Sequence, residues 1–243
     1  MREERMDSSR YKIYSDGSGQ DGRVGAAAIL LEEGNPRPTK MLQFHLGTTA
    51  EHTTYEAEAV GALLAMKIAK EVAKEAEQRG ERDAAISHYA DNQSVIKALH
   101  SRKSKPGQYL INSYRRGAHS FHRAKSIKVG LKWISAHSGV NGNEEVDKAA
   151  KGAAAGASSD KADLPAILRK GLKISRSALK QAKNAEVKNA WTQQWKRSPR
   201  HDRMTRVDPN HPYKKFQKWR DRLDRNQGSI LVQLRSGHLP INT

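Results

Sequence analysis

Four acidic residues occupy positions from which one fold could gather them around metal ions. Asp16 and Asp91 each end an apolar run that is typical of a strand. Glu58 falls early in a helical pattern, and Asp147 falls in the first turns of a later one, ten residues after His137. Carboxylate oxygens are the ligands that hard cations such as Mg²⁺ prefer, and two such ions about 4 Å apart can serve both the attacking and the leaving oxygen of a phosphodiester. In a very basic chain, this pattern indicates a two-metal nuclease site.

Positive charge is concentrated in the last third of the chain, whose overall formal net charge is +18. Residues 1–150 hold 23 Lys and Arg against 19 Asp and Glu, whereas residues 151–243 hold 21 against 7. Such a basic segment is typical of a polyanion binder, most often of nucleic acid; the alternative is a tail that is merely solvated. Four aromatic residues lie among these charges and favour ordered structure or a stacking role: Trp191, Trp195, Phe216 and Trp219.

Length and composition exclude several classes of protein. A chain of 243 residues can hold one large domain, or one domain and an appendage. It has no cysteine, which excludes disulfides, thiolate zinc sites and cysteine nucleophiles. No apolar run approaches the roughly 20 residues that span a bilayer, and the charged start lacks the apolar stretch of a secretory signal. We therefore expect an intracellular monomer with no membrane partner, in either the nucleus or the cytoplasm.

The first half of the chain begins with strands and a long helix. Three strand patterns are separated by short turns, which predicts an antiparallel meander: 10–16, 22–31 and 39–47. The first turn is expected at 17–22. Thr53 and Glu56 have the spacing of a capping box, so a helix of about 20 residues should begin there and end near Gly80.

Helices then alternate with strands. The predicted order is a strand over 84–90, helices over 92–101 and 108–124, a strand over 127–135 and a helix capped by Asn143. Strands that are joined through helices should lie parallel to the first, by right-handed crossovers. Ligands in open α/β sheets bind at the carboxyl ends of such strands. Asp16 and Asp91 fall at two of those ends.

We expect three regions along the chain. A disordered start over 1–9 precedes an α/β domain over 10–155, and a basic, mostly helical extension over 156–243 is expected to contact nucleic acid. Within the extension, 152–158 resembles a linker or a fraying helix end. The elements predicted after it are helices over about 174–196 and 213–225, a Pro- and Arg-rich loop over 197–212 and an amphipathic end from Ser229.

Four short segments carry the candidate acids in order: Asp16-Gly-Ser, Tyr55-Glu-Ala-Glu58-Ala, Ala90-Asp91-Asn-Gln, and the Gly-rich stretch from His137 to Asp147. Together they resemble the motifs of the type 1 ribonuclease H family, and within it the ribonuclease H domains of non-LTR retrotransposons, over about residues 10–155. The resemblance implies a mixed five-stranded sheet of order 3-2-1-4-5, with strand 2 antiparallel and helices on both faces. It also implies an endoribonuclease that cleaves the RNA strand of RNA–DNA hybrids and leaves 5′-phosphate and 3′-hydroxyl ends.

The resemblance implies a role for each candidate residue. Asp16 would bridge two Mg²⁺ ions, for which Mn²⁺ can substitute, and Glu58, Asp91 and Asp147 would complete the metal ligands. His137 would assist proton transfer or product release, which suits a side chain that titrates near neutral pH. Each residue also has a plainer interpretation: a turn residue for Asp16, a helix cap for Asp91, a favourable charge at a helix start for Asp147, and a surface histidine for His137.

Glu58 competes with Glu56 for the metal site. Residues two apart on a helix point about 200° from one another, so both cannot face one site. Glu56 has a structural role in the capping box. Glu58 is followed by small residues that would let the helix lie close to the sheet: Gly61, Ala62, Ala65 and Ala69. The pattern favours Glu58.

Substrate contacts are expected around the same edge of the sheet. The candidate groups are Gly17, Ser18, Gly19, Thr54 and Gln93. Substrate choice should come from the 2′-hydroxyl and the shallow minor groove of an A-like hybrid. Gln93 also suits the first turn of a helix.

Beyond residue 155 the resemblance to retrotransposon polyproteins is looser. Trp191-Thr-Gln-Gln-Trp195 and the segment from Ser229 to His238 are similar to the region after ribonuclease H in such polyproteins. The reverse transcriptase and zinc-binding regions of a parent polyprotein are therefore expected partners, beside the RNA–DNA hybrid. Two alternatives are a catalytically inactive ribonuclease-H-like fragment that binds nucleic acid, and an assembly protein of a mobile element.

Overall fold

The computed structural model describes residues 7–81, 84–101, 106–124, 127–135, 139–207 and 215–237. Two compact units divide the chain, Met1–Ala182 and Lys183–Thr243, and each is considered by itself. In the described ranges, no helix is both long enough and apolar enough to cross a lipid bilayer.

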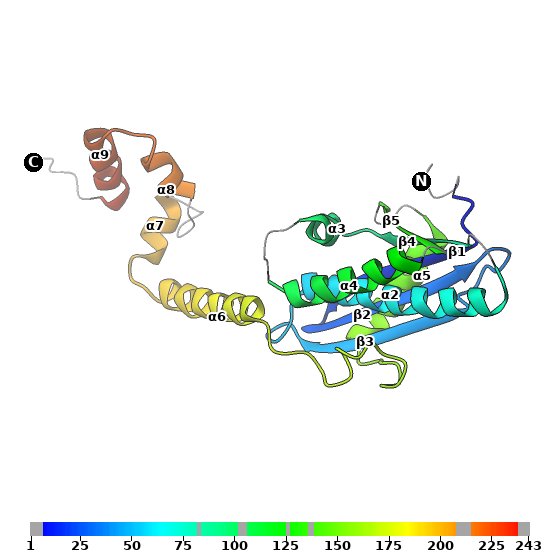
Figure 1. The fold of residues 1–243 in the computed structure, drawn as a ribbon. Helices are drawn as coiled ribbons and strands as arrows, with labels where there is room; N and C mark the ends of the chain where they lie inside the picture. The colour runs from blue at the N-terminus through cyan, green and yellow to red at the C-terminus, as the bar shows by residue number, and fades with distance from the viewer. Residues whose placement is uncertain are drawn as a thin grey trace, which may run out of the picture. The chain divides into compact units, whose positions relative to one another are not determined.

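A five-stranded sheet organises the first unit (Figure 1). Its strands are β1 (Tyr11–Gln20), β2 (Arg23–Glu32), β3 (Lys40–Thr48), β4 (Ala84–Ala90) and β5 (Ile127–Trp133). They lie in the order β3-β2-β1-β4-β5, with β2 antiparallel to both of its neighbours and β4 parallel to β1 and β5. This confirms the expected mixed sheet and its strand order.

Helices cover both faces of the sheet (Figure 1). They are α2 (Thr54–Gln78), α3 (Gln93–His100), α4 (Gln108–Ala124) and α5 (Asn141–Ala154). Side chains alternate between the faces of a strand, so Ile13 packs in the large core with α2 and α4, while Tyr14 packs in a smaller cluster with Val146 of α5. The interior strand β2 is buried on both faces from Val24 to Leu30, which explains its unbroken apolar run.

Local signals set the start of α2 and the end of β1. The capping box is present: Glu56 N–H donates to Thr53 Oγ1 over 3.2 Å, and Thr53 N–H donates to Glu56 Oε2 over 2.9 Å. The turn expected at 17–22 is shorter, because β1 continues to Gln20. Asp21 and Gly22 form the turn with φ of 50° and 73°, and two residues at positive φ match the twist of a hairpin. Asp16 therefore lies inside a strand.

Two further elements differ from expectation. Asn143 does not cap α5, which begins at Asn141 after Val140, and Asn143 is buried inside the first turn. The segment expected to be a loop over 197–212 contains a helix, α7 (His201–Val207). The other helices of this region are α6 (Arg176–Lys196), α8 (Lys215–Arg220) and α9 (Arg225–Ser236).

The first unit extends past the boundary expected at residue 155. Leu164 and Leu168 are buried in its large core, and Ser175 N–H donates to the carbonyl of Glu51 over 2.8 Å. These contacts hold 156–182 against the sheet domain, so the basic extension begins near Lys183. At the other end, residues 1–6 of the expected disordered start lie outside the described residues. Asp7 accepts a hydrogen bond from the Tyr89 hydroxyl.

Glycines allow α2 to lie directly on β1. A Cβ atom added at Gly17 would fall 2.3 Å from the backbone nitrogen of Glu58, and one added at Gly61 would fall 2.8 Å from the carbonyl oxygen of Asp16. Both distances are too short for real contacts with backbone atoms. The absence of a side chain at these two positions therefore sets the spacing between the strand and the helix that carry two of the candidate acids.

We predict that Gly61→Ala destabilises the protein although alanine favours helices by about 1 kcal/mol over glycine. The new methyl group meets backbone of β1, and overpacking of this kind costs about 1–3 kcal/mol. Urea unfolding measures the difference. Gly130→Ala in β5 is the matched control, because the nearest atom to its added Cβ is 4.0 Å away. Equal stability of the two variants would contradict the close packing of α2 on β1.

Candidate metal centre

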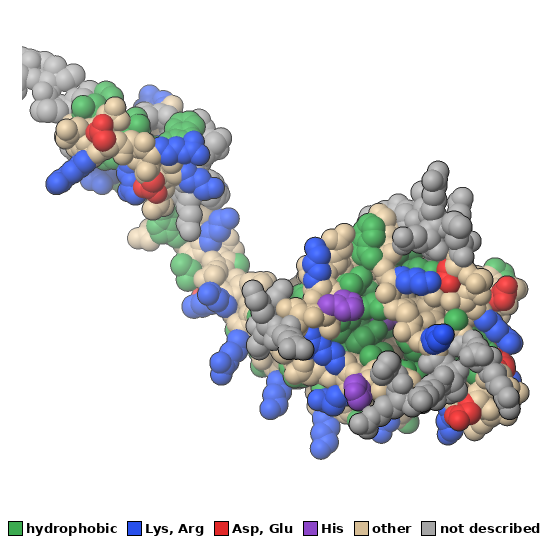
Figure 2. All heavy atoms as spheres, turned by 45° about the horizontal axis from the view of Figure 1, so that its top comes forward, with side chains coloured by type: hydrophobic (Ala, Val, Ile, Leu, Met, Phe, Trp, Pro, Cys, Tyr) green, Lys and Arg blue, Asp and Glu red, His purple; other side chains and the backbone are tan. Residues whose placement is uncertain are grey.

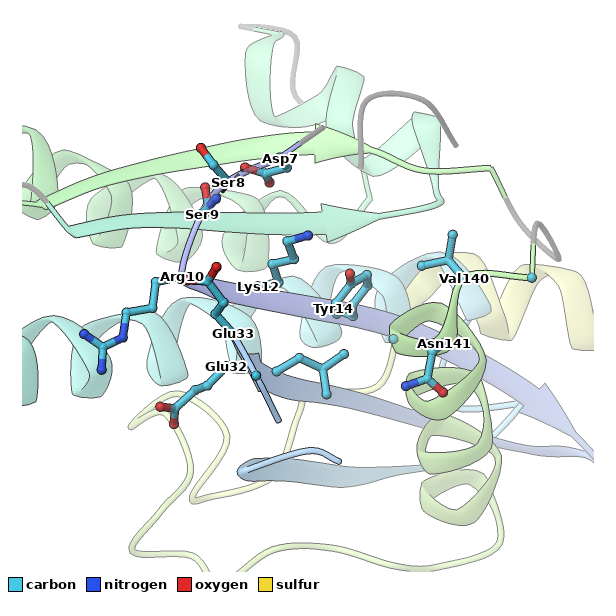
Figure 3. A pocket seen from close by; sticks show the side chains of 14 residues that line it. Asp7, Ser8, Ser9, Arg10, Lys12, Tyr14, Glu32, Glu33, Val140 and Asn141 are labelled. Atoms are coloured by element: carbon cyan, nitrogen blue, oxygen red, sulfur yellow. Dashed lines mark hydrogen bonds between the residues drawn. The ribbon is translucent and has the colours of Figure 1, made fainter. Parts of the chain in front are cut away.

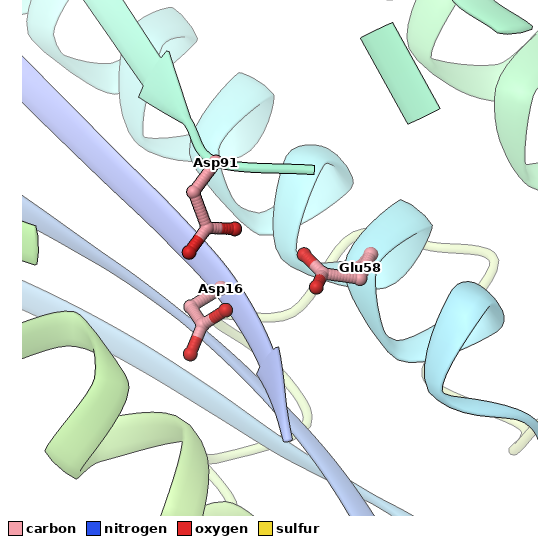
Figure 4. Close-up of side chains that lie close together, drawn as sticks. All are labelled: Asp16, Glu58 and Asp91. Carbon is pink, nitrogen blue, oxygen red and sulfur yellow. The ribbon is translucent and has the colours of Figure 1, made fainter. Parts of the chain in front are cut away.

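Three of the four candidate acids meet at one edge of the sheet. Asp16, Glu58 and Asp91 each present a carboxylate oxygen, and these oxygens all lie within 4.8 Å of one another. Figure 4 shows the three carboxylates pointing toward a common space, from β1, from α2 and from the segment after β4. Asp16 is 9% exposed, and the other two are partly buried. Three oxygen donors in this arrangement fit a hard divalent cation such as Mg²⁺.

Pairing of two parallel strands places the aspartates. The ladder between β1 and β4 ends with Ser15 opposite Ala90, so Asp16 and Asp91 are the next residues on neighbouring strands. Asn92 caps α3, accepting from Ser94 N–H over 2.9 Å and from Val95 N–H over 3.2 Å. The cap of α3 therefore comes from Asn92, and the plainer interpretation of Asp91 as the cap is wrong.

Glu58 and Glu56 separate as helix geometry predicts. Glu58 joins the two aspartates, whereas Glu56 remains in the capping box with Thr53. The side chain of Asn92 also hydrogen-bonds Glu58. Asn92 thus caps one helix and orients a carboxylate on another.

Asp147 lies outside the three-carboxylate group. In the described part of the chain, its Oδ2 accepts a hydrogen bond from Lys151 Nζ over 2.6 Å, one turn along α5. Its negative charge raises the pKa of Asp16, and the positive charge of Lys151 lowers it. Both side chains are therefore near enough to act electrostatically on the centre, and the role of Asp147 as a metal ligand stays a prediction.

The remaining predicted residues divide into two groups. His137 falls outside the described residues. Gly17, Ser18 and Gly19 continue β1 and pair with β2. Gly19 adjoins Thr54, because an added Cβ would fall 2.6 Å from Thr54 Cγ2, and Gln93 begins α3. Their contacts with a substrate stay predictions.

A separate cavity of about 440 Å³ lies beside the first half of β1 (Figure 3). Lys12 and Tyr14 point into it from the strand, and Val140 and Asn141 close it at the start of α5. None of the three clustered acids lines it. Its basic and acidic lining residues are mixed, so its chemistry favours no class of ligand.

Comparison with known proteins decides the family. The family model for RNase H matches residues 8–155. The chain belongs to the RNase H family.

Solved structures of RNase H proteins are similar to this family member over most of their own length. RNase H1 from the halophilic archaeon Halobacterium salinarum NRC-1 is 16% identical, with coverage of 61% of this chain and 100% of that chain and a TM-score of 0.44. The N-terminal RNase H domain of rv2228c from Mycobacterium tuberculosis is 15% identical, with coverage of 61% and 95% and a TM-score of 0.44. LC11-RNase H1 in complex with an RNA/DNA hybrid is 16% identical, with coverage of 59% and 98% and a TM-score of 0.43.

Burial, reinforced by repulsion between neighbouring carboxylates, sets the electrostatics of this acidic group. Burial, with the charge of Asp91 added, raises the pKa of Asp16 to about 6. Burial, with the charges of Asp16 and Asp91 added, raises the pKa of Glu58 to about 8, although hydrogen bonds from Asn92 and Gly17 act in the opposite direction. The raised pKa keeps Glu58 largely protonated at neutral pH in the metal-free protein, which reduces the repulsion among the three side chains. A divalent cation can replace that proton, which is a second reason that the donor set fits a metal.

Sequence reasoning missed two residues of the centre. Asn92 has a recognisable signal, since Asn just before a helical pattern is a preferred N-cap. Trp133 has no such signal. Its indole Nε1 donates to the carbonyl of Asp91 over 3.0 Å, and only the pairing of β5 beside β4 brings it there.

We predict that the metal-free protein loses stability as pH rises from about 5 to about 8. The folded-state pKa of Glu58 lies above its ordinary value of 4.5, so the native state binds more protons than the unfolded state across this window, and the free energy of unfolding falls with pH. Glu58→Gln should flatten the fall, as measured by urea unfolding in EDTA. Glu77→Gln, on an exposed position of the same helix, should not. If the free energy of unfolding of Glu58→Gln fell with pH as steeply as that of the wild type, proton binding by Glu58 in the folded state would be refuted.

Proposed function

We propose that this chain is an endoribonuclease that cleaves the RNA strand of RNA–DNA hybrids and leaves 5′-phosphate and 3′-hydroxyl ends. The observation that carries the proposal is the meeting of three carboxylates from β1, α2 and the end of β4 in a chain of the RNase H family. A protein that only binds nucleic acid gains nothing from like charges held together beside phosphates. Enzymes that act on phosphodiesters with metal ions need such a group of oxygen ligands.

The carboxylates have distinct tasks in the proposal. Asp16, Glu58 and Asp91 hold divalent cations, Mg²⁺ in the first place and Mn²⁺ as a substitute. When bound, two such ions supply positive charge to the attacking water oxygen and to the departing 3′-oxygen. Asp147 would supply a further carboxylate ligand if it were released from its ion pair with Lys151.

The substrate is held and selected by the surrounding residues. His137 moves a proton or assists release of the product. The strand segment Gly17–Gly19, with Thr54 and Gln93, contacts the hybrid in its minor groove, where the 2′-hydroxyl distinguishes RNA from DNA. On its motifs, we also propose that the chain derives from a non-LTR retrotransposon polyprotein.

One observation favours a second candidate, a ribonuclease-H-like domain that binds hybrids without cutting them. Asp147 is paired with Lys151 over 2.6 Å, and a permanent pairing would leave the metal ligands incomplete. Cleavage assays separate the two candidates, because both predict hybrid binding and only the first predicts a cut strand.

We predict that the protein cuts the RNA strand of a labelled hybrid only when Mg²⁺ or Mn²⁺ is present, and that it leaves duplex RNA and duplex DNA intact. Asp16→Asn should lower the cleavage rate by about a hundredfold or more, the scale on which loss of one electrostatic stabiliser acts. Hybrid binding should be largely retained. Asp160→Asn changes the charge equally at an exposed position and should cut normally. Full cleavage by Asp16→Asn would refute the assigned centre, and an inactive wild type that binds hybrids would favour the second candidate.

We also predict that Mg²⁺ or Mn²⁺ stabilises the folded protein through the same carboxylates. A cation at a hundredfold excess over its dissociation constant adds about 2.7 kcal/mol, which thermal unfolding in a metal titration detects. The effect should disappear in Asp16→Asn and Asp91→Asn and persist in Asp160→Asn. Equal stabilisation of all four proteins would place the bound cation elsewhere.

A further inference from the structure

The second unit carries a dense positive charge and has no apolar core in its described part. Its described residues, 183–207 and 215–237, contain 13 Lys and Arg against 4 Asp and Glu. Those four acids are all engaged: Glu186 with Lys183, Asp202 with His201, Asp221 with Arg220, and Asp224 as the cap of α9. Figure 2 shows Lys and Arg side chains along this unit and few acidic ones.

Apolar side chains of this unit face solvent. No large apolar side chain in its described residues is buried, and several are about half exposed or more. An exposed apolar patch that is rimmed by polar or charged residues often marks a binding surface. Helices that cannot bury their apolar groups against one another are expected to gain stability from a partner.

Two indole rings on α6 form a stacked pair. The ring centroids of Trp191 and Trp195 lie 6.4 Å apart with 10° between their planes, and Val187 lies one turn earlier on the same helical stripe. His201 contacts Trp195 edge-on at 5.7 Å. Trp195 is thus packed between two rings, whereas Trp191 is 45% exposed. From Lys183 to Lys196 the helix buries no residue.

Cationic side chains precede and follow this pair along the chain. Lys188 lies one turn before Trp191, and Lys196 and Arg197 follow Trp195. A flat aromatic face with cations on either side matches a nucleobase and the phosphates next to it. In a duplex, the faces of the bases are covered by their neighbours, so an indole can stack only on an unpaired base. The positive charge alone would bind duplex and single-stranded nucleic acid without preference.

We infer that α6 around Trp191 binds single-stranded nucleic acid, with a base stacked on the Trp191 indole, a phosphate against Lys188 on the same side of the helix, and phosphates against Lys196 and Arg197 where the helix ends. This site is distinct from the carboxylate centre and needs no metal ion. The proposed binding can therefore be tested independently of the proposed cleavage.

The test measures binding by the full chain in EDTA, which prevents metal-dependent cleavage. Fluorescence anisotropy reports the affinity for a labelled single-stranded DNA oligonucleotide and for the same strand in a duplex. Trp191→Ala should weaken single-strand binding about fivefold or more, the range expected for loss of one stacked base. Duplex binding should change less than about twofold, because no stacking is lost there.

Val187→Ala is the matched control, since it removes an apolar side chain that is 56% exposed on the same stripe but offers no ring. It should bind as the wild type does. Trp191→Phe keeps an aromatic face and should retain most of the affinity. Replacing Lys188, Lys196 and Arg197 by Gln should lower the slope of log affinity against log salt by about 2, from three lost phosphate contacts on a single strand.

Three results would overturn the inference. Wild-type affinity of Trp191→Ala for the single strand would show that no base stacks there, and equal losses for single strand and duplex would show a loss of charge or fold. Circular dichroism checks the helix content of each variant. If Trp191→Ala is less helical than the wild type, Trp191→Phe decides: retained single-strand affinity supports the stacking site, and an affinity as low as that of Trp191→Ala contradicts it.

Discussion

The close packing of α2 on β1 is the constraint on which the rest of the molecule depends. Gly17 and Gly61 lack the side chains that would separate the two backbones, and this approach brings the Glu58 carboxylate against that of Asp16. Like charges at such distances repel strongly where water is partly excluded. The apolar core beneath, which runs through β1, β2, α2 and α4, offsets that repulsion. The raised pKa values of Asp16 and Glu58 follow first from burial and then from the charges of the neighbouring carboxylates.

A bound cation and a bound proton would each reduce the repulsion among the carboxylates of Asp16, Glu58 and Asp91. The pairing of β1 with β4 fixes the backbone positions of Asp16 and Asp91, and the close packing of α2 on β1 fixes that of Glu58. Asp147 is different because it projects from α5, where Lys151 neutralises it over 2.6 Å. The three grouped carboxylates are therefore positioned by the sheet and α2, whereas Asp147 is positioned by α5 and its ion pair with Lys151.

The two units of the chain gain stability by different physical means. The first unit buries a large apolar core and recruits residues 156–182 to it through Leu164, Leu168 and the backbone of Ser175. The second unit, in its described residues, has helices with exposed apolar side chains and a concentration of positive charge. Capping of α9 by Asp224 and stacking of Trp191 on Trp195 are local contacts. Local contacts specify helices but bury little surface, so the apolar side chains of this unit remain exposed.

Sequence alone determined the features that arise within a few residues or from a repeated pattern. The strands, the capping box at Thr53 and Glu56 and the choice of Glu58 over Glu56 follow from periodicity and helix geometry, and the motif order implied the sheet that the structure confirms. Tertiary structure decided what depends on residues far apart in the chain. The turn lies at Asp21 and Gly22, so Asp16 lies inside β1 and not at its end. Asn92, not Asp91, caps α3. Residues 156–182 pack against the core through Leu164 and Leu168. The pairing of Asp147 with Lys151 was likewise open, because the same carboxylate can serve a metal or a neighbouring amine, and only the positions of surrounding charges choose between them.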